Sequence, residues 1–284
     1  MTLVVAVIAP GAMGAAVGKR LADHGVKVLT SLAGRSASSV ARAGEAGMIG
    51  ASDEAIAAAD FILSILPPGD ALPLADRFAP VLQASNAKPV YVDCNAINLA
   101  TLERVAAAIA PSGCAFVDAG IIGAPPKGND AGPRFYASGN AALRFALLRE
   151  SGLDVRVLDG PLSAASALKM SYAGITKGMQ AIGAAMMLAA TRAGSAEALT
   201  KELASSQKEM LALFKQQLPM MPAKAYRWIA EMREIAGFVA ADPAAHDLYE
   251  GAAHFYERIA EDFAADKKDV AALMGFLAKD SAGS

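Results

Sequence analysis

The sequence of 284 residues predicts a doubly wound α/β sheet followed by an all-α C-terminal domain. From residue 2 to about residue 160, short β-branched runs alternate with alanine-rich helical stretches, as in a parallel sheet covered by helices. After Asp159-Gly160-Pro161 no strand pattern follows, and the chain to residue 284 has the character of helices. We therefore expect two domains, residues 1–161 and residues 162–284.

The expected elements of the first domain follow one another in a regular alternation. Residues 3–8 are a continuous apolar run, as a strand that is buried on both faces requires. Residues 14–24 form the first helix, which Gly25 ends because glycine suits the left-handed position after a helix. Further strands are expected at residues 26–30, 61–66, 90–93, 115–118, 134–138 and 155–158.

The expected helical domain opens with a long central helix from about Ser163 to Ala193. Charged residues interrupt it, and its alanine and glycine content suits a buried helix of a soluble protein better than a membrane span. This helix is too apolar to be covered by the residues that follow it alone. A second copy of the chain would bury it, so we expect a homodimer. Pro219, Pro222 and the turn Ala241-Asp242-Pro243 divide the rest of the domain.

Composition and charge exclude several classes of protein. With 54% hydrophobic and 19% charged residues, the chain folds into a globular protein rather than remaining disordered. A formal net charge of -2 argues against a nucleic-acid binder. Cys94 and Cys114 form neither a metal spacing nor a disulfide framework, and no basic region precedes the first apolar run. We expect a cytoplasmic protein with reduced buried thiols, no metal site and no membrane partner.

One loop in the first domain has the pattern of a dinucleotide site. Between the first strand and the first helix it runs Ala9-Pro10-Gly11-Ala12-Met13-Gly14, which is G-x-G-x-x-G with alanine at the first glycine. The second glycine of such a loop lets the backbone approach a pyrophosphate, and the third lets the helix pack on the strand. The helix would direct free N–H groups and its positive end at phosphate. The loop predicts a Rossmann-type cofactor site, and a tight turn without ligand is the alternative.

The end of the second strand indicates which nucleotide binds. Sites for NAD usually carry an acidic residue about 20 residues beyond the loop. Residues 30–36 contain no Asp or Glu, but they do contain Arg35 next to Ser36 and near Ser31. A guanidinium group beside hydroxyl groups suits a 2′-phosphate, so we expect NADP(H) rather than NAD(H). The alternative is that Arg35 is only an exposed loop residue.

Residues 5–14 resemble the start of the β-hydroxyacid dehydrogenases, the group that contains 3-hydroxyisobutyrate and 6-phosphogluconate dehydrogenases. The likeness continues through about the first 180 residues. Residues 64–68 are similar to the strand end that passes the cofactor, and residues 93–96 stand where the family has Asp-x-Ser-Thr near the nicotinamide. The resemblance implies further cofactor-binding residues, namely Leu66, Pro67 and Asn95.

The resemblance also implies a catalytic residue. Residues 160–169 stand where the family has a glycine-rich segment leading into a helix with the catalytic lysine, which makes Lys169 the general acid/base. The chemistry agrees, because removing a hydride from a carbinol requires a base for the hydroxyl proton. Desolvation in an apolar helix would move the pKa of Lys169 toward the working pH. The alternative is a lysine that only extends to solvent.

Two departures from the family pattern concern the substrate. The family has Asn or His, and then Asn, where this chain has Tyr172 and Ala173. A phenol can still donate a hydrogen bond to a substrate oxygen, and Tyr172 and Thr176 share a helix face with Lys169. We therefore expect Tyr172 to act in catalysis and, with Thr176, to contact the substrate.

The second departure lies in the segment 118–124, which stands where the family has its substrate loop. Ile122 replaces a serine that holds a carboxylate in the family, and Gly123 and Ala124 complete the expected substrate-binding loop. The pocket is then more apolar, or the anion of the substrate is held elsewhere. Lys127 and Arg134 are candidates for holding this anion. The alternative is that both are only solvated surface side chains.

Beyond residue 200 the likeness to the well-known members weakens, and residues 224–235 look more like a less characterised branch with a divergent helical domain. Arg227 and Trp228 are expected to close over the active site, with Trp228 binding substrate. Packing of Tyr226 and Trp228 at a subunit interface is the alternative.

The leading functional hypothesis is an NADP-preferring oxidoreductase that interconverts a small hydroxy acid or related alcohol and its carbonyl. The first alternative is an imine reductase on the same scaffold. Such enzymes commonly have Asp or Tyr in the place of Lys169, so the lysine favours the alcohol reaction. The second alternative is an NADP(H) sensor without turnover, for which Ile122 and Ala173 leave room. The resemblance implies dimerisation through the helical domains.

Overall fold

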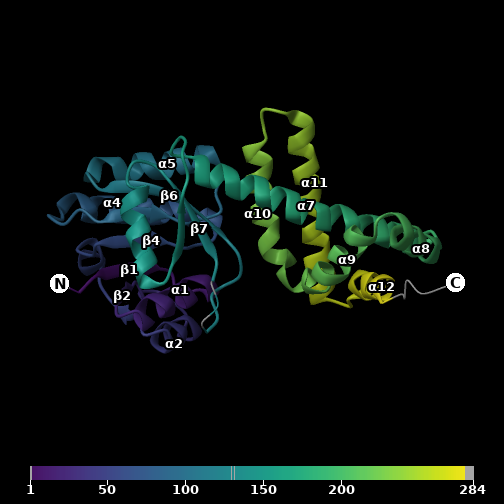
Figure 1. The fold of residues 1–284 in the computed structure, drawn as a ribbon, viewed down its shortest axis with the longest axis horizontal. Coiled ribbons are helices and arrows are strands. Elements are labelled where there is room, and N and C mark those ends of the chain that lie inside the picture. Colours follow the sequence, from purple (N-terminus) through teal and green to yellow (C-terminus); the bar gives the residue numbers. More distant parts are fainter. Residues whose placement is uncertain (1, 129, 131, 279–284) are drawn as a thin grey trace. The chain divides into compact units, whose positions relative to one another are not determined.

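The computed structural model of the chain describes residues 2–128, 130 and 132–278. The chain divides into two compact units, Met1–Met170 and Ser171–Ser284. The first unit holds the sheet and the second is helical (Figure 1).

The first unit is built on one eight-stranded sheet with the order β3-β2-β1-β4-β5-β6-β7-β8. Every neighbouring pair is parallel except β6 and β7, which are antiparallel. The strands are β1 (Val4–Ile8), β2 (Lys27–Thr30), β3 (Ile49–Gly50), β4 (Phe61–Ser64), β5 (Val90–Asp93), β6 (Ala115–Ile122), β7 (Arg134–Ser138) and β8 (Asp154–Val157). The expected doubly wound sheet is confirmed.

The strand order reverses at β1. From β1 the chain builds outward to β2 and β3, and then returns to place β4 on the other side of β1. Open α/β sheets bind ligands outside the carboxyl ends of the strands at such a switch point. The glycine loop follows β1 directly, so the fold places the loop at this position.

Two strands differ from the sequence-based expectation. Strand β3 was not expected, because a two-residue strand leaves too short a pattern to recognise. Strand β6 continues past residue 118 to Ile122, because the antiparallel strand β7 pairs with it from Asp118 to Ile122. The segment expected to be a substrate loop therefore begins as a strand.

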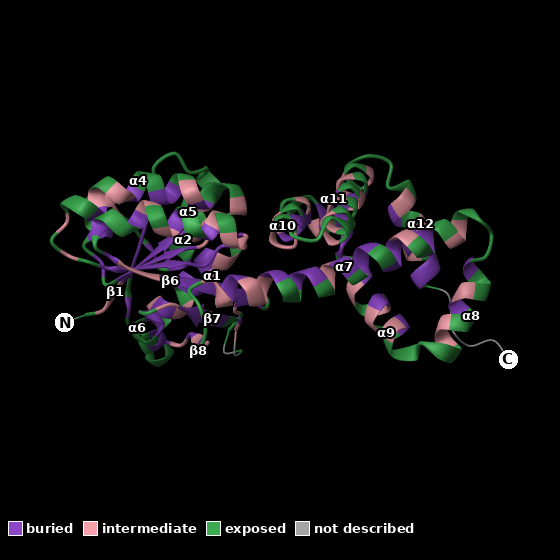
Figure 2. Cartoon of the chain, turned by 90° about the horizontal axis from the view of Figure 1, so that it is seen from above, coloured by how far each residue is buried: buried purple, intermediate pink, exposed green. Residues whose placement is uncertain are grey.

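Helices cover both faces of the sheet. Successive residues of a strand point to opposite faces, and Val5 and Val7 lie in one core cluster while Ala6 and Ile8 lie in another. Figure 2 shows the buried strands between helices with exposed outer sides. The elements between the strands are α1 (Ala12–Asp23), α2 (Ala37–Glu45), α3 (Asp53–Ala57), η1 (Pro68–Asp70), α4 (Ala71–Ala84), α5 (Leu99–Ile109), η2 (Ala110–Ser112), α6 (Ala142–Phe145) and η3 (Ala146–Ser151).

The second unit contains only helices among its described residues, as expected. Helix α7 (Ala164–Arg192) begins in the first unit and continues into the second. The expected breaks are found, with Pro219 and Pro222 in short 3-10 turns and Asp242 capping the helix that begins at Pro243. The remaining elements are α8 (Ala196–Ser206), α9 (Lys208–Gln217), η4 (Leu218–Met220), η5 (Pro222–Lys224), α10 (Ala225–Phe238), α11 (Pro243–Ala264) and α12 (Lys268–Leu277).

Glycines on α7 allow close packing within the second unit. A Cβ atom on Gly174 would lie 2.8 Å from the hydroxyl of Tyr249, and one on Gly183 would lie 2.5 Å from the ring of Phe214. Real Cβ atoms essentially never approach that closely. The alanine- and glycine-rich composition of α7 therefore lets α11 and α9 pack directly against its backbone.

The boundary between the two compact units lies later in the chain than the domain boundary expected near residue 161. The start of α7, through Met170, belongs to the first unit. The physical reason is that Ser166 and Lys169 are hydrogen-bonded to β6. Across the described residues, no helix combines the length and the apolar character that a membrane span needs.

Candidate functional site

The glycine loop joins β1 to α1, and its two glycines have different surroundings. A Cβ atom on Gly14 would lie 2.0 Å from the carbonyl oxygen of Ala9, so only glycine lets α1 pack this close to the end of β1. A Cβ atom on Gly11 would meet nothing within 4 Å. Gly14 therefore serves packing, while Gly11 keeps the space in front of the loop open.

The start of α1 offers hydrogen-bond donors to this open space. Gly11 is the N-cap residue, it provides no side-chain cap, and the first turn of α1 has no acidic residue. The first N–H groups of a helix lack partners within the helix and favour an anion. Within the loop, Ala12 is exposed and Met13 is half-buried, while Ala9 and Pro10 are buried. These features fit the pyrophosphate of a dinucleotide.

An arginine from the neighbouring helix α2 contacts the loop. The Nη1 atom of Arg42 donates to the carbonyl oxygen of Pro10 at 3.0 Å. This half-buried cation was missed from the sequence, because no motif places an arginine at that distance from the loop. Only the packing of α2 against α1 brings Arg42 to the loop.

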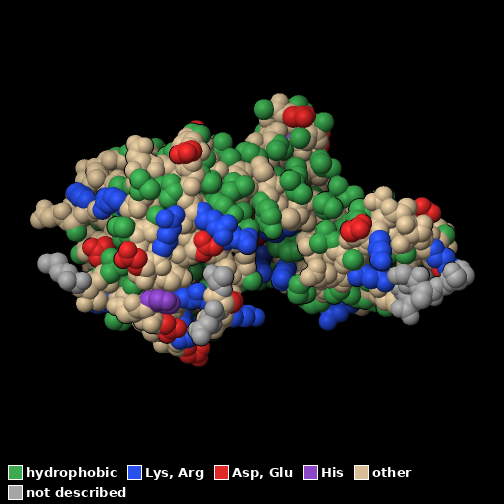
Figure 3. Space-filling view, viewed as in Figure 1, with side chains coloured by type: hydrophobic (Ala, Val, Ile, Leu, Met, Phe, Trp, Pro, Cys, Tyr) green, Lys and Arg blue, Asp and Glu red, His purple; other side chains and the backbone are tan. Residues whose placement is uncertain are grey.

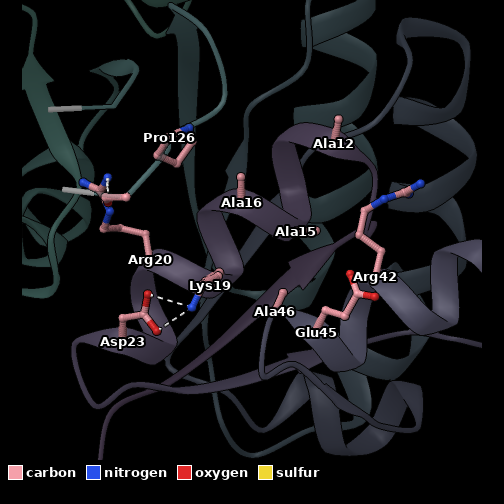
Figure 4. Close-up of a pocket in the computed structure, with 11 residues that line it drawn as sticks. Ala12, Ala15, Ala16, Lys19, Arg20, Asp23, Arg42, Glu45, Ala46 and Pro126 are labelled. Atoms are coloured by element: carbon pink, nitrogen blue, oxygen red, sulfur yellow. Dashed lines mark hydrogen bonds and ion pairs between the residues drawn. The ribbon is translucent and has the colours of Figure 1, made fainter. Parts of the chain in front are cut away.

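A groove of about 270 Å³ runs along the outer side of α1 (Figure 4). Small side chains of α1, Ala12, Ala15 and Ala16, lie along it. Its charged residues have both signs and include the ion pair between Lys19 and Asp23. This groove therefore has no marked preference for an anion, in contrast to the glycine loop at the start of α1.

The residues expected to recognise a 2′-phosphate lie between β2 and α2. Arg35 is exposed on this loop. Ser36 is the N-cap residue of α2, and its hydroxyl accepts a hydrogen bond from Ser39 N. Ser31 is buried, and its hydroxyl accepts from Arg77 at 2.7 Å. Of these residues, Arg35 and Ser36 are accessible to a ligand, whereas Ser31 is held by Arg77.

Asn95 lies after β5 and ties two strand ends together. Its Nδ2 atom donates to Ser64 Oγ at 2.8 Å and to Asp93 Oδ2 at 2.9 Å. Its Oδ1 atom accepts from Leu66 N at 2.6 Å. Asn95 is only 3% exposed, so it holds the half-buried Leu66 and the exposed Pro67 in place at the carboxyl edge of the sheet.

Two buried carboxyl groups lie in neighbouring strands at this edge. Asp93 of β5 and Asp118 of β6 are register partners, and both are fully buried. Burial raises the pKa of Asp93 to about 7, and the charge of Asp118 adds to this effect. Burial likewise raises the pKa of Asp118 to about 6, although Ser166 donates two hydrogen bonds to it. Both residues lie in segments that resemble family motifs, but the sequence indicated no role for either of them.

Lys169 lies on α7 beside the end of β6. Its side chain is half-buried, and its Nζ atom donates to the carbonyl oxygen of Ile121 at 2.7 Å. Ile122 is buried, whereas Gly123 and Ala124 are exposed. Lys169 is therefore hydrogen-bonded to the segment 118–124, which is expected to bind substrate, at Ile121.

The glycine loop, the segment after β4, Asn95 and Ile121 all belong to the first unit. Ile8, Ser64, Asp93 and Asp118 form a continuous line of register partners across β1, β4, β5 and β6. The named segments follow these residues in the chain, so they gather at one edge of the sheet. This edge is the candidate functional site.

The remaining expected site residues belong to the second unit. Tyr172 is 49% exposed, and the Thr176 hydroxyl donates to the backbone carbonyl of Tyr172 at 2.8 Å. Trp228 is buried edge-to-face against Tyr256, with ring centroids 5.2 Å apart, and Lys177 lies over the indole. Trp228 thus packs inside its own unit, while the neighbouring Tyr226 and Arg227 are exposed.

Lys127 and Arg134, the two expected alternatives for holding an anion, are both exposed. The loop that carries Lys127 is tied to α1, because Arg20 donates to the backbone carbonyl of Asp130 at 2.9 Å and forms an ion pair with its carboxylate. These contacts of Arg20 fix the described part of the loop between β6 and β7 against α1.

Comparison with protein families gives two matches. The NAD binding domain of 6-phosphogluconate dehydrogenase matches residues 4–149, and a domain of unknown function, DUF1932, matches residues 190–259. The chain belongs to the β-hydroxyacid dehydrogenase family of NAD(P)-dependent oxidoreductases that act on CH–OH groups. The expected resemblance, with a divergent helical domain, is confirmed. No curated protein matches the chain.

Solved structures share the fold over nearly the whole chain. The conserved protein MTH1747, of unknown function and structurally similar to 3-hydroxyacid dehydrogenases, is 29% identical, with 91% of this chain and 97% of that chain covered and a TM-score of 0.70. Mycobacterium tuberculosis 3-hydroxyisobutyrate dehydrogenase is 20% identical, with 97% and 99% covered and a TM-score of 0.67. An imine reductase from Myxococcus stipitatus in complex with NADP+ is 18% identical, with 98% and 100% covered and a TM-score of 0.53. The last two likenesses concern the fold alone.

Proposed function

We propose that the protein is an NADP-preferring oxidoreductase that interconverts a small hydroxy acid or related alcohol and its carbonyl, with Lys169 as general acid/base. The observation that carries this proposal is the position of Lys169. Its amine is held at the Ile121 carbonyl, at the same edge of the sheet as the open glycine loop. The family match independently supports an NAD(P)-dependent reaction.

The cofactor would lie along the carboxyl edge of the sheet and supply or accept the hydride. Residues of the glycine loop would bind its pyrophosphate through the backbone N–H groups at the start of α1. Leu66, Pro67 and Asn95 would border it further along the edge. The preference for NADP rests on Arg35 and Ser36, which are accessible after β2 in a segment without acidic residues.

Lys169 would move the proton of the reaction. In the reduction its ammonium gives a proton to the carbonyl oxygen of the substrate, and in the oxidation its neutral amine takes the hydroxyl proton. The hydrogen bond to Ile121 fixes the direction of the side chain. Residues proposed to contact the substrate are Ile122, Gly123, Ala124, Tyr172, Thr176 and Trp228.

The test of this proposal begins with the binding of NADPH and NADH, followed by fluorescence, and continues with turnover of hydroxy acids and cyclic imines. Lys169→Ala should lower kcat by at least about 100-fold, the usual share of a general acid or base, with little change in NADPH affinity. Lys201→Ala removes an exposed lysine of α8 and serves as the matched control. Full turnover by Lys169→Ala would show that the proposed role is wrong.

Arg35→Ala tests the nucleotide preference separately. Loss of the guanidinium should weaken NADPH binding by about tenfold and leave NADH binding almost unchanged, because only NADPH carries the 2′-phosphate. Arg42→Ala is the informative comparison, since Arg42 contacts the loop rather than the segment after β2. An unchanged ratio of the two affinities in Arg35→Ala would remove the basis for the NADP assignment.

Reduction of a C=N substrate is the second candidate. The observation that leaves room for it is the exposed phenol of Tyr172 on α7, because a tyrosine can supply the proton for this reaction. Tyr172→Phe should then abolish turnover of cyclic imines, while Lys169→Ala should leave it intact. The opposite pattern favours the alcohol reaction.

We also propose that the protein is a homodimer through its second unit. Four apolar side chains of α7 are 37% to 61% exposed and follow one another at steps of four, three and four residues, namely Ile175, Met179, Ile182 and Met186. This apolar stripe has the spacing of a helix-packing seam and carries no charge, so two copies can meet without burying an unpaired charge. Figure 3 shows hydrophobic side chains gathered over the helical unit.

Grooves on both sides of the apolar stripe support this arrangement. One of about 190 Å³ lies between α7 and α11 at Leu248 and Tyr249, and another of about 240 Å³ lies against α8 and α9 at Leu203 and Phe214. Ile182 lines both grooves. Analytical ultracentrifugation should show a dimer that Ile182→Glu dissociates and Lys201→Ala does not. A monomeric wild-type protein at micromolar concentration would contradict the proposal.

We propose that the protein is cytoplasmic on the basis of its two thiols. Cys94 and Cys114 are both free and buried. Burial raises the pKa of the Cys94 thiol, so this group stays protonated and unreactive at neutral pH. Free thiols of this kind are typical of proteins in a reducing compartment.

A further inference from the structure

Four buried polar residues form a continuous row across the sheet. Ser64, Asp93, Asp118 and Ser138 are successive register partners on β4, β5, β6 and β7, and all four are fully buried. Neighbouring strands lie about 4.8 Å apart, so the two carboxyl groups are close neighbours inside the protein. A pair of buried acids costs stability, and the partners of each acid indicate what the pair achieves.

The two acids hold different parts of the candidate site. Asp93 accepts two hydrogen bonds from Asn95, which in turn holds the segment after β4 through Leu66 N. Asp118 accepts from the backbone N–H and from the hydroxyl of Ser166, both at 2.7 Å. Asp93 thus faces the cofactor part of the site, and Asp118 faces the helix that carries Lys169.

The start of α7 depends on the sheet for its capping. The first N–H groups of a helix have no partners within the helix. Here Ser166 N donates to Asp118, and Ala165 N donates to the hydroxyl of Ser138 at 3.0 Å. Both acceptors come from the neighbouring strands β6 and β7. A buried carboxylate at a helix N-terminus also gains from the helix dipole.

These contacts set the position of Lys169 along β6. Lys169 follows Ser166 by one helical turn, and its partner Ile121 follows Asp118 by three residues. Between the two hydrogen-bonded pairs lies Gly120, where a Cβ atom would come within 2.8 Å of the carbonyl oxygen of Ala165. These two hydrogen-bonded pairs and the close backbone contact at Gly120 therefore hold α7 in a single register against β6.

We propose that Asp118 is a positioning residue that holds Lys169 at the candidate site through Ser166. This inference rests on the proposed function of Lys169 as the acid/base. Asp118 touches neither substrate nor cofactor in this role. It fixes the helix turn from which the Lys169 side chain reaches Ile121, so its loss should affect the proton-transfer step and spare cofactor binding.

The test compares Ser166→Ala and Asp118→Asn with Ser112→Ala. Ser112 is a suitable control, because it is a buried serine of the first unit that also makes two hydrogen bonds, to Ile109 and Cys114. The first measurement is the rate at which acetic anhydride acetylates Lys169, relative to Lys201 in the same sample, by peptide mass spectrometry. Ser166→Ala and Asp118→Asn should raise this ratio by about fivefold, the effect of one lost hydrogen bond, and Ser112→Ala should leave it unchanged.

The second measurement separates positioning from general damage. With any substrate that the wild-type protein turns over, Ser166→Ala should lower kcat by about tenfold and leave the Kd and KM for NADPH unchanged. Ser112→Ala should change neither kcat nor KM, although it lowers stability. If Asp118→Asn does not fold, Ser166→Ala carries the test by itself, because it removes only the hydroxyl donor.

The outcomes distinguish this inference from the proposed function. If the wild-type protein turns over no compound, or if Lys169→Ala stays active, the proposed function fails while the labelling ratio still decides the positioning. An unchanged ratio in Ser166→Ala would overturn the role of Asp118, as would an equal rise in Ser112→Ala. A lower kcat accompanied by a weaker NADPH affinity would also overturn it, because the damage would then extend to the cofactor loop.

Discussion

At the glycine loop the functional groups are backbone atoms, whereas around Lys169 they are side chains held by other side chains. The loop needs only the absence of a side chain at Gly11 and Gly14 and the free N–H groups at the start of α1. Lys169 needs a specific carbonyl, a serine and a buried acid from a strand 48 positions away in the chain. The first kind of site is encoded locally, and the second depends on how two elements pack.

The largest effect that tests this comparison is expected from Gly14→Ala. The new Cβ would lie 2.0 Å from the Ala9 carbonyl oxygen, a backbone atom that cannot move without displacing β1. We expect a loss of about 3 kcal/mol or more in the free energy of unfolding, as for severe overpacking. Urea unfolding followed by far-UV circular dichroism measures it. Gly69→Ala, where a Cβ meets nothing within 4 Å, is the control.

The next effect concerns the buried acids and has a defined sign. The folded-state pKa of Asp93 is raised to about 7 and that of Asp118 to about 6, above the ordinary value of 3.8. At pH values between the ordinary pKa of 3.8 and the raised pKa values, the folded protein binds more protons than the unfolded chain. The free energy of unfolding should therefore fall as the pH rises from about 4 to about 7. Asp93→Asn should flatten this dependence, by on the order of 2 kcal/mol between about pH 5 and about pH 8.

The same unfolding experiment provides the check on this pH dependence. Asp23→Asn removes an exposed carboxyl group from α1 and should leave the slope unchanged. A slope in Asp93→Asn equal to that of the wild-type protein would mean that this buried acid does not titrate in the stated range.

The smallest effect is expected from Gly11→Ala, and it separates the two glycines. Its φ angle of -71° suits alanine and the new Cβ meets no atom within 4 Å, so stability should not change. The methyl group would occupy the space in front of the α1 N–H groups and weaken NADPH binding by about tenfold, through loss of a charge-assisted hydrogen bond. Equal NADPH affinities of Gly11→Ala and the wild-type protein would contradict the placement of the phosphate.

The sequence predicted most of the sheet because strands buried on both faces leave continuous apolar runs. It missed β3, which has two residues, and it ended β6 too early. That error has a physical cause, since residues 119–122 are a strand only because β7 turns back to pair with them. The pairing of two segments leaves little trace in the local pattern of either.

The residues of the candidate site likewise include some that the sequence indicated and others that it did not. The glycine loop was recognisable from its residues, and Lys169 from its resemblance to a family motif. Arg42 at the loop and Ser166 at Asp118 were not recognised, because each depends on a contact between separate elements. Trp228 stays a proposed substrate contact, but the sequence did not indicate that its indole packs against Tyr256 and Lys177 inside the helical unit.

By itself, the sequence determined where strands and helices form and where glycines leave the backbone accessible to a phosphate. Both follow from side-chain size and apolar spacing among near neighbours. Only the tertiary structure decided which side chains meet. The line from Ser64 through Asp93 and Asp118 to Ser138 exists because four strands align in one register. The place of Lys169 is decided in the same way, since α7 can lie at only one position along β6.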